Sequence, residues 1–271
     1  QQALYHNEKI HHVGVDEKFL YIANTRENAI TILEKESNKN SKRINLYPFV
    51  DKTGYPISKD HNHINSLKPL KDGIVFTAHN GGEIGSIIGV IYEKSCMLFP
   101  YKNRGIHDIL IDKKDLIFSD SFGKQEINIK GMEKYGAIFI NGKTIIQKTY
   151  FARGIYLGKT NNYCGSSFHG KRDIRFSGCG SLIRSDKNFT PMEEIRLPFS
   201  QVHDLLGIHG ERDFSNSYIT SLQCQNVINM LFKSLGEPLY EGSFYVEEFY
   251  KKTRKIYKSK LDFLEILKLL K

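Results

Sequence analysis

The chain has 271 residues, of which 40% are hydrophobic and 12% aromatic, enough apolar material for a sizeable core. Its formal net charge of +9 favours an anionic partner, but no nucleic-acid-binding motif accompanies that charge. We therefore predict a solvated basic surface and no nucleic-acid partner. No apolar run is long enough to span a bilayer, so we expect no transmembrane segment.

A sequence pattern that predicts two short strands recurs along the chain, and we call it the repeated phrase. Its first copy, in residues 10–25, joins HVGV to FLYIANT through an acidic turn. The copies begin at intervals of roughly 40 to 50 residues, which is the spacing of propeller blades. The residues that lead the five copies are His12, His63, His107, Arg153 and His203.

This recurrence predicts an all-β fold, a five-bladed β-propeller over residues 1–242. A blade is a small sheet that cannot bury both faces alone, whereas blades stacked around an axis bury those faces. Asn141-Gly142 is the strongest hairpin signal, between expected strands at residues 135–140 and 144–146. A β-sandwich or barrel with coincidental spacing is the alternative.

The repeat pattern loosens after the fifth lead residue. Residues 227–232 fit either a strand or a helix on periodicity alone. The sequence beyond them reads as helix, so we assign residues 243–271 to a C-terminal helical extension packed on the propeller. Its apolar stripe of Leu264, Leu267 and Leu270 would cap the propeller or dock a partner, and capping is the commoner fate. The oligomeric state is left open.

The cysteines bear on the cellular compartment. They are Cys96, Cys164, Cys179 and Cys224. They show no C-x-x-C spacing, so we predict buried free thiols rather than a zinc ribbon or a disulfide framework. Free thiols favour a reducing compartment, and we expect a cytoplasmic location. A sequon at Asn188 leaves secretion open, and the start on Gln1 leaves open whether a segment precedes it.

A resemblance to known propellers lies in residues 20–33, which read LYIANT and then, after two residues, NAITIL. This phrase resembles the repeat of YVTN and NHL-type propellers and of regucalcin- and gluconolactonase-like ones. The His-x-x-x-Asp opening and the Asn-Thr pair resemble an uncharacterised propeller family sometimes joined to tetratricopeptide repeats. The resemblance covers residues 10–170. It implies the fold and leaves function open, because this architecture hosts binding modules and enzymes alike.

The lead residues are the candidate functional site. Lead strands of a propeller line its channel, so we expect His12, His63, His107 and His203 to converge as metal ligands. Converging neutral imidazoles suit a divalent transition metal, and we favour Fe(II), with Zn(II) as the alternative. This set of four histidines resembles the iron site of carotenoid-cleaving oxygenases, and the resemblance is limited to the identity of the ligands. Arg153 would bind a small anionic substrate beside the metal.

Two acidic residues follow two of the lead histidines. Asp108 and Asp204 would orient an imidazole as acceptors in catalysis, or would simply form hydrogen bonds between blades.

These residues support two functional hypotheses. The first is a metal-dependent enzyme acting on a small anionic substrate, as an oxidoreductase such as an oxygenase, or as a hydrolase or lyase. The second is a non-catalytic propeller that binds a sugar, a peptide or a protein partner. In the second case the lead histidines only form hydrogen bonds to a neighbouring blade.

Overall fold

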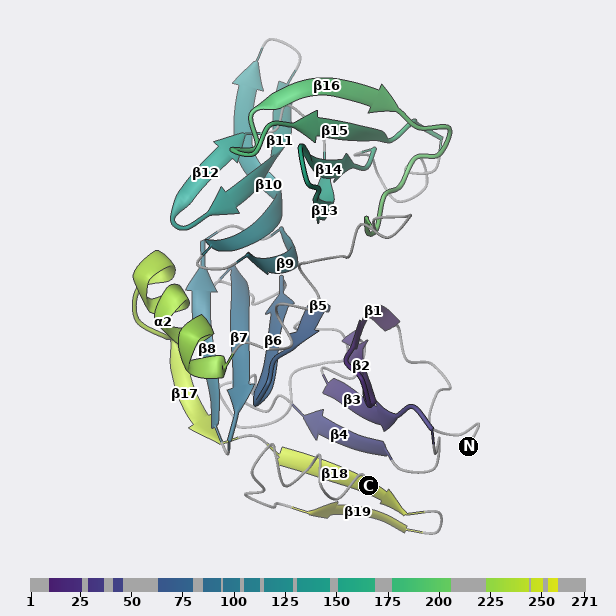
Figure 1. Ribbon diagram of the computed structural model, residues 1–271, viewed down its shortest axis with the longest axis vertical. Coiled ribbons are helices and arrows are strands. Elements are labelled where there is room, and N and C mark those ends of the chain that lie inside the picture. Colours follow the sequence, from purple (N-terminus) through teal and green to yellow (C-terminus); the bar gives the residue numbers. More distant parts are fainter. Residues whose placement is uncertain are drawn as a thin grey trace. The chain divides into compact units, whose positions relative to one another are not determined.

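The computed structural model describes residues 10–25, 29–36, 41–45, 63–79, 85–93, 95–102, 105–112, 115–128, 131–146, 151–168, 177–205, 223–243, 245–250 and 253–257. The chain forms two compact units. The first contains Gln1–Tyr101 and Thr220–Lys271, and the second contains Lys102–Ile219. Figure 1 shows the strands and the helix α2 (Cys224–Leu235) of the described residues.

The first sheet of the first unit is an antiparallel meander. Its strands are β1 (Ile10–Val15), β2 (Phe19–Asn24), β3 (Ala29–Glu34) and β4 (Ser41–Asn45), hydrogen-bonded in chain order. The acidic turn closes the first hairpin, because Asp16 Oδ1 accepts from the backbone N–H groups of Lys18 and Phe19, both at 2.8 Å. The hydroxyl of Tyr21 donates to Asp16 Oδ2 at 2.6 Å.

The second sheet repeats this order. It contains β5 (Ile64–Pro69), β6 (Gly73–Ala78), β7 (Ser86–Tyr92) and β8 (Ser95–Tyr101). Its apolar face packs against that of the first sheet, and their shared core includes Tyr21, Ile32, Leu67 and Phe76. Close approach requires Gly14, because a Cβ there would lie 2.6 Å from Leu67 Cδ1.

A helix and three C-terminal strands complete the first unit. Helix α2 (Cys224–Leu235) buries Val227, Ile228 and Leu231, and Asp72 Oδ1 accepts from the N–H of Cys224 at 2.7 Å. Strand β17 (Tyr240–Ser243) pairs with β8, β18 (Tyr245–Tyr250) pairs with β4, and β19 (Thr253–Tyr257) pairs with β18. The C-terminal strands therefore add new edge strands to the two existing sheets.

The second unit holds two more meanders. One contains β9 (Ile106–Asp112), β10 (Asp115–Asn128), β11 (Gly131–Ile140) and β12 (Lys143–Ile146). The other contains β13 (Ala152–Leu157), β14 (Asn162–Ser166), β15 (Ser181–Ser185) and β16 (Pro191–Arg196). Their common core includes Leu110, Ile138, Ile155 and Cys164. The predicted hairpin is confirmed, with Asn141 and Gly142 at φ of 46° and 88° between β11 and β12.

A hydroxyl at the end of the repeated phrase joins successive repeats. Thr25 Oγ1 donates to the carbonyl of Ile64 at 2.6 Å, and Ser121 Oγ donates to that of Ala152 at 2.9 Å. Ser167 Oγ donates in the same way to the carbonyl of Val202, at 2.9 Å. Residues 201–205 therefore lie where the next lead strand would begin, beside the sheet of β13–β16.

The all-β class and the blade-like meanders are confirmed, but the described residues form four such sheets where five blades were predicted. The fifth repeat is described only through Leu205. The run at 227–232, which the sequence left open, is part of α2 because it packs against the second sheet. The strands beyond it join sheets that already exist.

The helix predicted after residue 243 is wrong over residues 245–250 and 253–257, which form β18 and β19. Aromatic and β-branched residues in β18 favour a strand, and its register places Glu247 opposite Arg43 and Glu248 opposite Lys42. The leucine stripe at 264–270 lies outside the described residues. The division at residue 242 stays a prediction.

All four cysteines are free thiols, and three of them, Cys96, Cys164 and Cys224, are buried. Burial raises the pKa of the Cys96 thiol to about 12, so this thiol is inert at neutral pH. No helix in the described part of the chain combines the length and apolar character needed to cross a membrane.

Candidate functional site

A β-bulge recurs near the start of the lead strands β1, β5, β9 and β13. In β9 the pairing with β10 leaves Asp108 as the extra residue, and in β13 the pairing with β14 leaves Gly154. Both residues have left-handed backbone conformations, with φ of 45° and 71°. His107 and Arg153 precede these bulges directly, so they hold equivalent positions.

The bulge also shows that two of the lead histidines were placed in the wrong register. In β1 the residues paired on either side of the bulge align His11, rather than His12, with His107. In β5 the equivalent residue is Asn65, and His63 precedes the strand. A one-residue shift in a strand moves a side chain to the other face, so equal spacing in sequence did not give equal positions.

His12 connects the first two sheets. Its Nδ1 accepts a hydrogen bond from the backbone N–H of Leu67 at 3.4 Å. Burial, and secondarily the charge of Lys68, lower the pKa of His12 to about 3, so the ring is neutral at pH 7. This hydrogen bond between sheets is the structural role that the non-catalytic hypothesis assigns to a lead histidine.

His63 belongs to a row of three imidazoles in the first unit. Its ring centroid lies 4.4 Å from that of His11 and 4.2 Å from that of His79, both edge-to-face. His63 also has a positive φ of 45°. His79 ends its repeat at the position that Thr25 and Ser121 occupy in theirs.

The second unit brings together three of the predicted site residues around an aromatic ring. We call His107, Phe151, Arg153 and His203 the lead-strand cluster. The Arg153 guanidinium carbon lies over the Phe151 ring, 4.6 Å from its centroid, and the His107 ring centroid lies 5.7 Å from it. Arg153 Nη1 donates to His203 Nδ1 at 3.4 Å. Arg153 and His107 are buried, whereas His203 is exposed.

The surroundings of His203 keep its ring neutral. Partial desolvation of the ring, and secondarily the charge of the Arg153 guanidinium, lower the pKa of His203. A guanidinium can only donate, so Nδ1 of His203 accepts and the ring proton lies on Nε2. The cluster therefore presents one fixed positive charge beside a neutral imidazole that offers an N–H.

The two predicted carboxylates have backbone partners. Asp108 Oδ2 accepts from the N–H of Gly154 at 2.5 Å and from Ser119 Oγ at 3.5 Å. Asp204 Oδ1 accepts from the N–H of Leu205 at 2.8 Å. Asp108 thus forms the hydrogen bond between blades that was the alternative to a catalytic role, and Asp204 stabilises its own segment.

Within the described ranges, no group of three or more His, Cys, Asp or Glu side chains is placed to hold a metal ion. Two predicted ligands also use their lone pair elsewhere, since His12 and His203 each accept a hydrogen bond at Nδ1. A neutral imidazole has one such lone pair, so these two rings do not fit metal ligation in their present contacts. The predicted metal stays a prediction.

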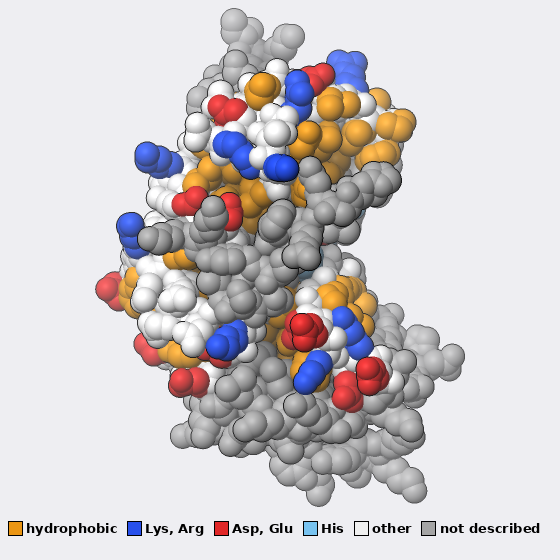
Figure 2. Space-filling model, viewed as in Figure 1, with side chains coloured by type: hydrophobic (Ala, Val, Ile, Leu, Met, Phe, Trp, Pro, Cys, Tyr) orange, Lys and Arg blue, Asp and Glu red, His pale blue; other side chains and the backbone are white. Residues whose placement is uncertain are grey.

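The charges on the described surface are mixed. On the face shown in Figure 2, Lys and Arg side chains lie among Asp and Glu side chains rather than in one patch. The solvated basic surface that composition favoured stays a prediction.

Comparisons with known proteins give limited similarity. No family model matches the chain, and no curated protein matches it in sequence. Among solved structures it is similar to a streptogramin B lyase, at 16% identity and a TM-score of 0.43, over 70% of this chain and 55% of that one. It is also similar to a luciferin-regenerating enzyme, at 13% identity and a TM-score of 0.37, over 69% of this chain and 60% of that one.

The chain thus spans little more than half the length of either structure. Because both TM-scores are below 0.5, we infer no activity from them. The YVTN and NHL likeness stays a resemblance.

Sequence reasoning missed two residues of this region, Phe151 and Ser121. Phe151 lies two residues before Arg153 and contacts both Arg153 and His107. Ser121 ends its repeat where Thr25 and Ser167 end theirs, and its Oγ lies 2.9 Å from His107 Nδ1. The recurring hydroxyl at the end of the phrase was the signal that could have identified Ser121.

Proposed function

We propose that the lead-strand cluster binds a small anionic substrate, a carboxylate or a phosphate, and that the chain is an enzyme acting on it. The observation that carries this proposal is the placement of Arg153, whose guanidinium lies on Phe151 and contacts the neutral ring of His203. A guanidinium offers several N–H donors in a planar fork that matches carboxylate and phosphate oxygens.

The surroundings of Arg153 strengthen an interaction with an anion. Arg153 is 8% exposed, and a charge in a partly desolvated setting interacts more strongly than one in water. His203 adds an N–H from Nε2 without adding a second positive charge. A single Arg beside neutral donors favours a small anion with one or two charges.

A histidine-bound divalent metal, with Fe(II) favoured over Zn(II), is the second candidate for this chain. One observation favours it: Nδ1 of His107 lies 3.0 Å from the carbonyl of Gly105, the contact that commonly orients a metal-bound imidazole. The contacts of His12 and His203 oppose it. Metal content by mass spectrometry on untagged protein, with His107→Ala beside it, tests this candidate. About one metal per chain, lost in the variant, would establish it.

The anion-binding proposal is tested by a ligand panel on the full chain. Thermal shift would compare phosphate and small carboxylates with neutral isosteres, such as acetate with acetamide. Arg153→Ala removes charge-assisted hydrogen bonds worth about 1.5–3 kcal/mol, so affinity should fall roughly 10- to 100-fold.

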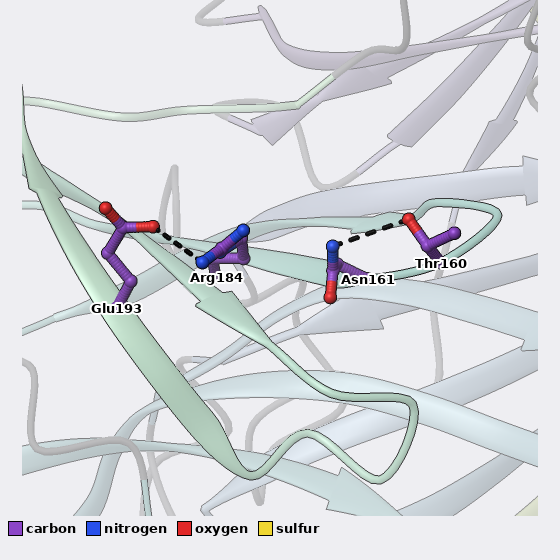
Figure 3. A network of polar contacts seen from close by, with 4 residues as sticks. All are labelled: Thr160, Asn161, Arg184 and Glu193. Atoms are coloured by element: carbon purple, nitrogen blue, oxygen red, sulfur yellow. Dashed lines mark hydrogen bonds and ion pairs between the residues drawn. The ribbon is translucent and has the colours of Figure 1, made fainter.

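The matched control is Arg184→Ala in the same sheet. Arg184 forms an exposed ion pair with Glu193 at 3.0 Å, close to the Thr160–Asn161 contact (Figure 3). This variant should bind as the wild type does. Equal stabilisation by anions and neutral isosteres, or equal loss in both arginine variants, would refute the proposal. Turnover of a bound anion would separate an enzyme from the non-catalytic alternative.

A further inference from the structure

One strand pairing in this chain joins distant segments whose charges are opposite. Strand β18 pairs antiparallel with β4 in the first sheet. An apolar residue and two glutamates of β18 lie opposite an isoleucine and two basic residues of β4, in the pairs Val246–Ile44, Glu247–Arg43 and Glu248–Lys42. Opposite charges and apolar residues set across from each other stabilise an antiparallel pair. The sequences Val-Glu-Glu and Lys-Arg-Ile therefore form a matched set of strands.

The same pattern occurs a second time, in two strands that lie at sheet edges. Strand β16 reads Met-Glu-Glu at residues 192–194, and β19 reads Arg-Lys-Ile at residues 254–256. Among the described strands, β16 is the last of its four-stranded sheet and β19 is the last of the six-stranded sheet (Figure 1). Each pairs on one side only, β16 with β15 and β19 with β18. Within the described part of the chain, this second matched set is therefore not paired.

Strand β16 is open to a partner. All 6 of its residues are exposed, among them the apolar Met192 at 59% and Ile195 at 40%. An edge strand presents backbone N–H and C=O groups with which another strand can pair. The outer edges of the third and second sheets, β12 and β17, read Lys-Thr-Ile-Ile and Tyr-Glu-Gly-Ser, so neither has two adjacent acidic residues. Strand β16 is thus the described outer edge that suits a basic strand.

We propose that β16 of one molecule pairs antiparallel with β19 of a second copy of this chain. The register that repeats the pairing of β18 with β4 gives the pairs Met192–Ile256, Glu193–Lys255 and Glu194–Arg254. Glu193 already forms an ion pair with Arg184 of β15 at 3.0 Å, so a basic residue on its other side extends that pair into a network. Pro191 has no N–H and ends the pairing at the start of β16.

The contact joins two different surfaces of the chain. A closed dimer therefore needs two such contacts, and a contact that does not close continues into longer assemblies. Either assembly has a mass that rises with protein concentration.

Two residues of this register can be changed without removing an ion pair inside the chain. Glu194 lies opposite Ile183 of β15. Arg254 lies opposite Phe249 of β18. Glu194→Lys and Arg254→Glu each set like charges across the proposed contact, whereas a mixture of the two variants again sets a basic residue opposite an acidic one.

The exposed turn between β1 and β2 supplies the matched controls. Glu17→Lys and Lys18→Glu change the net charge by the same amounts as the two test variants, at positions away from both edges. Neither residue belongs to a strand, so both controls should associate as the wild type does.

The experiment is sedimentation velocity on the full chain over a concentration series at low ionic strength. The wild type should exceed the monomer mass and dissociate on dilution. Glu194→Lys and Arg254→Glu should each weaken association roughly 2- to 30-fold, the effect of replacing an attractive cross-strand pair by a repulsive one. An equimolar mixture of the two variants should associate more tightly than either variant alone.

Circular dichroism checks that each variant is folded. Glu194→Gln and Arg254→Gln remove the charge without reversing it, so they should weaken association by a smaller factor, and they replace a reversed variant that does not fold.

Three results would overturn the proposal. A wild type that stays monomeric at every concentration would show that the charges of β16 keep other strands away from this edge. Equal weakening by Glu194→Lys and Glu17→Lys would assign the association to net charge. Folded variants whose mixture associates no better than each variant alone would place the contact between copies elsewhere.

Discussion

His12 makes the stability of the first unit depend on pH. Its folded-state pKa is lowered to about 3, whereas an unfolded histidine titrates near its model value of 6.5. Between these values the unfolded chain binds one more proton than the folded chain. Stability is therefore complete above pH 6.5 and falls as the pH drops toward 3, by up to about 1.4 kcal/mol per pH unit. Between pH 7 and pH 5, and allowing for partial exposure, the loss is on the order of 1–2 kcal/mol.

Replacing His12 by Gln removes this titration and keeps an oxygen that can accept from the N–H of Leu67. Urea unfolding at pH 7, 6 and 5 measures the free energy of unfolding of both proteins. The wild type should lose on the order of 1–2 kcal/mol more than His12→Gln over that range. The control His11→Gln changes the exposed neighbour and should keep the His12 contribution. Parallel curves for wild type and His12→Gln would show that the ring is not held neutral by the fold.

Three further substitutions test the packing. Gly165→Ala would place a Cβ against the carbonyl oxygen of Arg153 and the side chain of Val202, so it should cost about 1–3 kcal/mol by urea unfolding. Leu231→Ala leaves a cavity at a buried position of α2 and should lower the free energy of unfolding by about 2–5 kcal/mol. The control Gln225→Ala, at an exposed position of the same helix, should change it little, and equal effects of the two variants would mean that α2 is not docked. Asp108→Ala leaves the N–H of Gly154 without its carboxylate acceptor and should lower the free energy of unfolding by about 1–3 kcal/mol. The control Asp204→Ala, at an exposed position, should change it little. A larger loss in Asp204→Ala than in Asp108→Ala would refute the stabilising hydrogen bond between blades.

The blade-like part of the fold could be predicted because its signals are local. Alternating apolar residues, the acidic turn at Asp16 and the Asn141-Gly142 hairpin each act within a few residues, and their repetition reveals the unit. The C-terminal region could not be predicted in this way. The sequence of residues 227–232 is compatible with a helix or a strand, and packing against the second sheet favours the helix. Strand β18 forms on the open edge of β4, a pairing between distant segments that no local pattern encodes.

The site was predicted in part for a similar reason. His107, Arg153 and His203 follow the true repeat, and the second unit brings them together around Phe151. His12 and His63 were assigned by the spacing of histidines, but the residues paired on either side of the bulge place His11 and Asn65 at the positions equivalent to His107. A bulge leaves no signature in the spacing of histidines, so only strand pairing could identify His11 and Asn65 there.

The central claim is that Arg153 makes the lead-strand cluster an anion site. The most direct measurement is a calorimetric titration of phosphate and acetate into the wild type, Arg153→Ala and Arg184→Ala at low ionic strength. We expect saturable binding of at least one anion to the wild type and to Arg184→Ala, weakened roughly 10- to 100-fold in Arg153→Ala. Binding that Arg153→Ala leaves unchanged, or no binding of either anion to the wild type, would contradict it.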